Sequence, residues 1–83
     1  MNIREFKKQS VCTSMHRDVL TANDFYFETF YYDVFTIIGS NLFIKEGIIK
    51  DSYANQRDCT QYFEGSKRIS ESQFKNRIKN LKS

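Results

Sequence analysis

The feature that most constrains the fold of this chain is an aromatic-rich stretch from Leu20 to Gly39. If the backbone turns by about 100° per residue, its apolar side chains gather in one stripe roughly 120° wide that no charged residue enters. The members of the stripe are Phe27, Phe30, Tyr31, Val34, Ile37 and Ile38. This periodicity predicts an amphipathic helix over residues 22–38.

The ends of the stretch also favour a helix. Thr21 and Asp24 have the spacing of an N-terminal capping box, and Gly39 can adopt the left-handed conformation that ends many helices. Aromatic and β-branched residues alone would favour a strand. However, Glu28 and Asp33 interrupt the alternation that a half-buried strand requires, so we expect a helix.

A second helix is predicted over residues 71–81. Ser70 and Gln73 form a capping box, and Phe74, Ile78 and Leu81 recur on one face. Lysine and arginine side chains in the last turns favour the negative end of the helix dipole.

Three weaker segments complete the pattern. Residues 52–63 have apolar side chains at helical spacing, and Ile3 and Phe6 indicate one or two helical turns near the start. Residues 42–50 allow a short β-hairpin that turns at Gly47. We therefore expect a mainly α fold, a single small three- to four-helix domain over residues 1–83, with an α+β fold as the alternative.

Size and composition limit the class of protein. A chain of 83 residues buries only a small core, so a partner or a second copy would add stability. No apolar run approaches the roughly 20 residues that span a bilayer, and the first residues lack a signal-peptide core. We expect a cytoplasmic protein without membrane association.

Charge is distributed unevenly along the chain. The net charge is +3, but residues 1–17 carry four basic and one acidic side chain, residues 18–66 three basic and eight acidic, and residues 67–83 six basic and one acidic. A concentrated basic segment is typical of proteins that bind a polyanion. The same segment could instead pair with the acidic middle of its own chain.

The last two predicted helices have the order of a helix-turn-helix, with residues 52–63 as the first helix and 71–81 as the reader. One edge of the reader would pack on the core, while lysine, arginine and asparagine side chains would contact phosphates and bases of DNA or RNA. The predicted nucleic-acid contacts are Lys67, Arg68, Ser72, Lys75, Asn76, Arg77, Lys79, Asn80 and Lys82.

A second hypothesis is a small interaction or inhibitor protein of the phage- or plasmid-accessory type. Exposed aromatic side chains beside acids suit a protein–protein interface. On the predicted helix 22–38 these are Tyr26, Tyr32 and Phe35, which would bind a larger protein target or a second copy.

Enzymatic chemistry is not indicated. The chain has one histidine and lacks a phosphate-binding glycine loop and the common hydrolase motifs. Cys12, His16 and Cys59 are too few for a four-ligand zinc site. We expect no catalytic residue, metal or cofactor.

Overall fold

The computed structural model describes residues 1–81 and shows a mainly antiparallel β fold with a short helix near each end of the chain. In chain order the elements are α1 (Ile3–Gln9), β1 (Val11–Ala22), β2 (Phe27–Thr36), β3 (Leu42–Asp51), β4 (Gln56–Glu64), β5 (Lys67–Ile69) and α2 (Glu71–Lys79). The prediction of a mainly α, three- to four-helix domain is therefore wrong. The sheet also far exceeds the single short hairpin that the α+β alternative contained.

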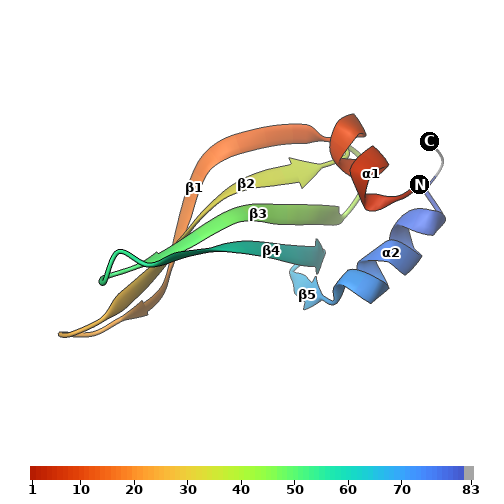
Figure 1. The fold of residues 1–83 in the computed structure, drawn as a ribbon. Helices are drawn as coiled ribbons and strands as arrows, with labels where there is room; N and C mark the ends of the chain where they lie inside the picture. Colours follow the sequence, from red (N-terminus) through yellow and green to blue (C-terminus); the bar gives the residue numbers. More distant parts are fainter. Residues whose placement is uncertain (82–83) are drawn as a thin grey trace.

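The five strands form one sheet in the order of the sequence, β1-β2-β3-β4-β5, and each neighbouring pair is antiparallel. The described chain measures 48 × 21 × 18 Å. Figure 1 shows both helices at one end of the long axis and the β1–β2 and β3–β4 turns at the other. We call these the helical end and the distal end.

The hydrophobic core lies at the helical end, where α1 and α2 cover one face of the sheet. Phe6 of α1 packs edge-to-face on Phe74 of α2, with ring centroids 5.1 Å apart. The core side chains are Phe6, Leu42, Ile44, Ile69, Phe74 and Ile78, none more than 6% exposed. Toward the distal end Phe30 and Ile49 are also buried.

The two faces of the sheet follow from the strand register, because directly opposed residues of antiparallel strands share a face. The covered face, which lies beneath the helices, carries Phe35, Ile44 and Tyr62 on three adjacent strands. The opposite face, which we call the open face, carries Val34, Lys45 and Gln61 at the next positions.

The two helices agree with the sequence. Ser70 and Gln73 form the predicted capping box at the start of α2, and Phe74 and Ile78 are its buried residues. The helix ends at Lys79, two residues before the predicted end. The helical turns expected near the start are α1. Neither helix in residues 1–81 has the length and apolar character needed to cross a membrane.

Residues 22–38 do not form the predicted helix. They form the end of β1, the β1–β2 turn, β2 and the start of the β2–β3 turn, and the Thr21–Asp24 capping box is replaced by a turn centred on Asn23. The side-chain oxygen of Asn23 accepts hydrogen bonds from the backbone N–H groups of Phe25 and Tyr26 at 2.9 and 2.8 Å. Such local side-chain bonds stabilise turns in competition with helices.

The alternation of β2 is hidden because both of its faces are apolar. Phe30 and Tyr32 lie on the open face with their ring centroids 4.7 Å apart, while Phe35 packs against the core on the covered face. β2 lies between β1 and β3, so its intrinsic preference for a strand is reinforced by two ladders. The apparent helical stripe arises because a strand that is apolar on both faces also has apolar residues at helical spacing.

Residues 42–50 form one continuous strand, β3, rather than a hairpin. Gly47 lies inside this strand, opposite Tyr32 of β2 and Cys59 of β4. A Cβ atom at Gly47 would overlap the carbonyl oxygen of Tyr31 and lie 2.7 Å from the Cα of Tyr32. Glycine is therefore required here for close approach of two strands, not for a turn.

Residues 52–63 also differ from the prediction, because they form the β3–β4 turn and most of β4. The carboxylate of Asp51 accepts the backbone N–H groups of Tyr53 and Asn55 at 2.8 and 3.0 Å, which fixes the turn. The first helix of the expected helix-turn-helix is thus absent from the described structure.

Candidate nucleic-acid interface

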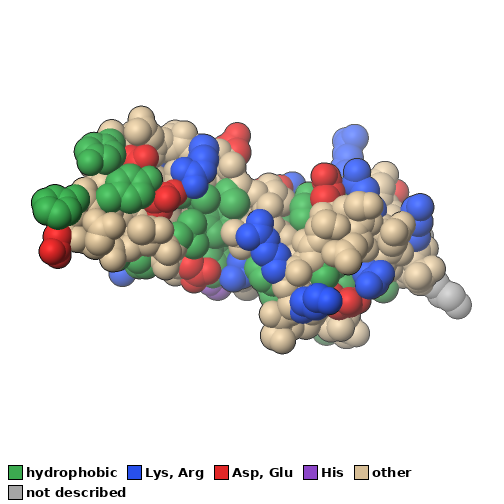
Figure 2. Space-filling model, turned by 90° about the horizontal axis from the view of Figure 1, so that it is seen from below, with side chains coloured by type: hydrophobic (Ala, Val, Ile, Leu, Met, Phe, Trp, Pro, Cys, Tyr) green, Lys and Arg blue, Asp and Glu red, His purple; other side chains and the backbone are tan. Residues whose placement is uncertain are grey.

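The fold brings the two basic ends of the sequence together. The N-terminal ammonium lies 3.4 Å from the carbonyl oxygen of Ile78, and Phe6 packs on Phe74. The acidic middle of the sequence forms most of the sheet, which extends away from the helices. Figure 2 shows Lys and Arg side chains spread over the helical end, and hydrophobic and acidic side chains gathered at the distal end.

Helix α2 presents its polar residues away from the core. Phe74 and Ile78 face the sheet and are fully buried. At 100° per residue, the opposite side of the helix carries Ser72, Asn76 and Lys79, with Lys75 and Asn80 at its margins. All five of these residues are exposed.

Ion pairs neutralise some of the cations at the helical end. Lys7 binds Glu46 at 2.7 Å, and Arg77 binds Glu64 at 2.9 Å. Lys75 lies 3.7 Å from Glu71 in an exposed pair on the same helix, which contributes little to stability. Within residues 1–81, the lysine and arginine side chains of this end without an ion pair are Arg4, Lys8, Lys67, Arg68 and Lys79.

These five cations come from three elements rather than from one reader helix. Lys67 and Arg68 belong to β5, the short edge strand before α2, and Arg4 and Lys8 belong to α1. Arg4 and Lys8 are not among the contacts predicted from the sequence, although the excess of positive charge in residues 1–17 was a signal for them. Lys82, which is among the predicted contacts, lies outside the described residues.

The three residues predicted for a protein interface do not share one surface. Tyr26 lies in the β1–β2 turn, with its ring 5.8 Å from that of Tyr53. Tyr32 stacks on His16 on the open face, at 5.3 Å between ring centroids. Phe35 lies on the covered face beneath α1, and the ammonium of Lys7 lies over its ring at 5.2 Å.

The distal end carries a different set of exposed aromatic side chains. Phe25 is 87% exposed and Tyr53 is 69% exposed at the two turns. Phe27 and Tyr31 follow along β2, each at least 42% exposed, on the covered face beyond the reach of the helices. This cluster was not predicted from the sequence, because its residues were assigned to helices.

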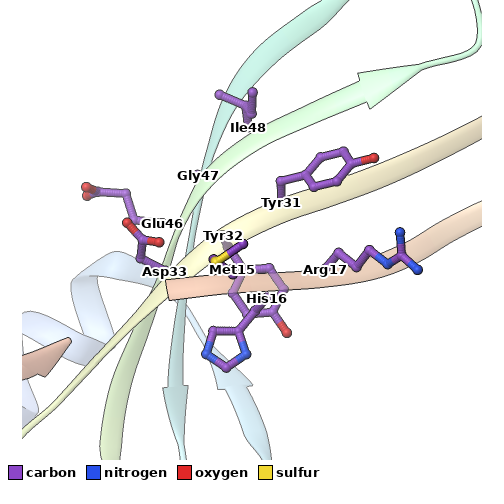
Figure 3. Close-up of a pocket in the computed structure, with 9 residues that line it drawn as sticks. All are labelled: Met15, His16, Arg17, Tyr31, Tyr32, Asp33, Glu46, Gly47 and Ile48. Carbon is purple, nitrogen blue, oxygen red and sulfur yellow. The ribbon is translucent and has the colours of Figure 1, made fainter. Parts of the chain in front are cut away.

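An open groove of about 620 Å³ lies on the sheet between the helices and the distal turns. Figure 3 shows Tyr31 and Ile48 on one side of the strands and the Asp33 and Glu46 side chains close together. Asp33 and Glu46 are directly opposed on β2 and β3, an arrangement in which like charges destabilise a sheet. The Lys7 ammonium compensates this repulsion through its contact with Glu46.

The cysteine and histidine side chains are dispersed. His16 lies near Thr13, with its Nε2 atom 2.8 Å from the hydroxyl oxygen, and two strands separate it from Cys59. Cys12 and Cys59 are both free thiols. In the part of the chain that the structure describes, no three metal-ligating side chains come together.

Comparison with known proteins adds no family to this description: no family model, no curated protein and no solved structure matches the chain.

Proposed function

We propose that this protein is a small, non-enzymatic nucleic-acid-binding regulator that contacts phosphates through its helical end. The observation that supports this proposal is the convergence of the two basic termini. Residues 3–9 and 67–79 together carry eight basic and two acidic side chains, a net charge of +6, on α1, β5 and α2. The helix-turn-helix geometry is not part of the proposal.

The five cations without ion pairs supply the affinity for phosphates. A cation that is already held by a carboxylate must lose that partner before it can neutralise a phosphate, so Arg77 and Lys7 contribute less. If all five contact phosphates, the logarithm of the binding constant falls with the logarithm of the salt concentration with a slope of about −4.5 on duplex DNA. The exposed amides of Asn76 and Asn80 can donate to phosphates or base edges.

The rest of the molecule restricts binding to one end. Residues 18–66 carry three basic and eight acidic side chains and form most of the sheet. A polyanion is therefore attracted by the helical end and repelled by the body of the sheet. The expected cytoplasmic location fits such a ligand.

The test is fluorescence anisotropy with labelled duplex and single-stranded oligonucleotides between 50 and 200 mM salt. The double variant Arg68→Gln/Lys79→Gln removes two cations that lack ion pairs, and it should reduce the salt slope by about two units. The matched control, Arg17→Gln/Lys50→Gln, removes the same charge from exposed positions on β1 and β3.

The binding constant and the salt slope of the control should be closer to those of the wild type than the values of the helical-end variant are. Equal losses in the two variants would show that net charge alone drives binding. Binding that does not change with salt, or no binding at 50 mM salt, contradicts the proposal.

A second candidate function, binding of a larger protein target as an interaction or inhibitor protein, is favoured by the exposed aromatic side chains at the distal end. Phe25 and Tyr53 project from separate turns and contribute little to the core, so Phe25→Ser/Tyr53→Ser should leave the fold intact. Nuclease-treated co-purification from the native host should then show a protein that the wild type retains and this variant loses. Identical protein profiles would argue against this function.

A further inference from the structure

The open face of the sheet carries two stacked pairs of aromatic rings. His16 stacks on Tyr32, with ring centroids 5.3 Å apart and ring planes inclined by 16°. Phe43 stacks on Phe63 at 4.8 Å and 4°. The ammonium of Lys45 lies over Tyr32 at 4.8 Å and over Phe63 at 4.9 Å, so it contacts one ring of each pair. We call these four rings together with Lys45 the aromatic array.

The helices leave the aromatic array uncovered. The sheet side chains that pack with the buried cluster beneath α1 and α2 all belong to the covered face, and they are Phe35, Leu42, Ile44, Tyr62 and Ile69. The four rings of the array have the opposite orientation, and each of them is partly exposed. Within residues 1–81 the array therefore presents aromatic surface to solvent.

Two rows of directly opposed residues cross the open face at the array, and neither contains an acidic side chain. The first row crosses all five strands and consists of Val11, Thr36, Phe43, Phe63 and Arg68. The second row consists of Thr13, Val34, Lys45 and Gln61. Arg68 makes no ion pair within residues 1–81 and belongs to the cations of the helical end. A nucleic acid that contacts Arg68 is therefore adjacent to the aromatic array.

Phe43 has one ring face that can receive a further planar group. Phe63 lies against the face toward β4, so the opposite face is turned toward Thr36 on β2. Thr36 has a short side chain, and its hydroxyl donates to the carbonyl oxygen of Leu42 at 3.2 Å. A planar base can therefore extend the stack at Phe43.

We propose that the open face binds a single strand of DNA or RNA, with a base stacked on Phe43 and a neighbouring phosphate on Arg68. The bases of a single strand are accessible, whereas a duplex hides their ring faces. Aromatic side chains on a positively charged surface are a common means of binding single strands. This inference rests on the proposed function and narrows its ligand from nucleic acid in general to single strands.

The charge of the two rows favours this ligand over a second copy of the chain. Two copies that docked through these rows would place two basic, acid-free surfaces against each other. Asp18 lies 3.4 Å from Lys45 and neutralises part of its charge, so Arg68 and the other cations of the helical end supply most of the attraction for phosphates. The aromatic array supplies a preference for bases, which those cations cannot provide.

The first test compares two single strands of equal length and charge, one with bases and one abasic, in DNA and in RNA form. Fluorescence anisotropy with the wild type at one salt concentration should show at least about fivefold tighter binding of the strand with bases. Equal affinities for the two strands overturn this inference and leave the phosphate contacts of the proposed function in place. No binding of any oligonucleotide at about 50 mM salt overturns both.

The second test removes the stacking surface. Phe43→Leu keeps an apolar side chain, and it should weaken binding of the strand with bases at least about fivefold. Because no cation is lost, binding of the abasic strand and the salt slope should stay unchanged. Phe43→Tyr retains the ring and should bind like the wild type. The matched control Phe35→Leu removes a ring from the covered face and should also bind like the wild type.

Circular dichroism checks that the three variants are folded, and the comparison of the two strands uses the wild type alone. Weaker binding of the abasic strand by Phe43→Leu, or equal losses in the two leucine variants, would contradict stacking at Phe43. Sedimentation equilibrium tests the other occupant. A wild-type dimer that Phe43→Leu dissociates, together with equal affinities for the two strands, would assign this face to a second copy and overturn the proposal.

Discussion

Replacing Gly47 with alanine tests the close approach of β2 and β3 at this glycine. The new methyl group would meet the backbone of Tyr31 and Tyr32, which cannot move aside as a flexible side chain can. Relief requires the two strands to separate at this point. Because the N–H of Ser52 donates to the carbonyl oxygen of Phe27, the narrow hydrogen-bonded pairs on either side of Gly47 are Tyr31–Ile48 and Asp33–Glu46.

The expected cost follows from these contacts. Overpacking against fixed backbone costs about 1–3 kcal/mol. Weakening about two of the flanking ladder hydrogen bonds adds about 1 kcal/mol for each bond. The smaller entropy of the unfolded alanine chain returns about 0.4–1 kcal/mol. We therefore expect Gly47→Ala to lower the free energy of unfolding by about 3 kcal/mol.

Urea denaturation followed by circular dichroism measures this difference, and an m value of about 1–1.5 kcal/mol/M gives a midpoint shift of about 2–3 M. The control is Gly65→Ala, at a φ of 61° with no atom within 4 Å of the added Cβ. That variant should lose only about 1 kcal/mol from its left-handed backbone. Equal losses in the two variants, or no loss at Gly47, would refute the close approach described here.

Two further predictions concern the core and the pH dependence of stability. Phe74→Ala removes a fully buried ring and should cost about 3–5 kcal/mol, whereas Phe25→Ala, at an exposed turn, should change stability by less than about 0.5 kcal/mol in the same urea assay. Burial raises the pKa of the Tyr62 hydroxyl, and the nearby Glu71 and Glu46 carboxylates raise it further. Because the folded-state pKa lies above the unfolded value of 10.0, this contribution to stability is complete below pH 10 and is lost as the pH rises through the folded-state pKa. Tyr62→Phe should therefore show a smaller loss of stability above pH 10 than the wild type, and parallel curves would contradict this assignment.

The sequence was sufficient for the elements whose signals are local. The capping box of Ser70 and Gln73 and the buried residues Phe74 and Ile78 depend on contacts within a few positions, and α2 forms as predicted. The side chains that α2 exposes were also identified. The convergence of α1 with α2 could not be predicted, because it depends on the path of the sheet between them.

The strands were misread because their signals depend on neighbours that are distant in the sequence. β2 is apolar on both faces, so its alternation disappears and its aromatic residues imitate a helical stripe. Gly47 and Gly39 were both interpreted as chain-reversal or end signals. Gly39 does have a positive φ of 90°, but it serves a turn between strands, while Gly47 serves strand packing.

The main cluster of buried side chains lies at the helical end, and toward the distal end residues 1–81 bury only Phe30 and Ile49. Amide-proton protection should decline along the long axis, from the packed helices toward the two turns, because local opening costs least where few apolar contacts must break. The distal end can therefore open locally while the helical end stays folded. Substitutions in the two turns of the distal end should accordingly change the free energy of unfolding of the whole chain little.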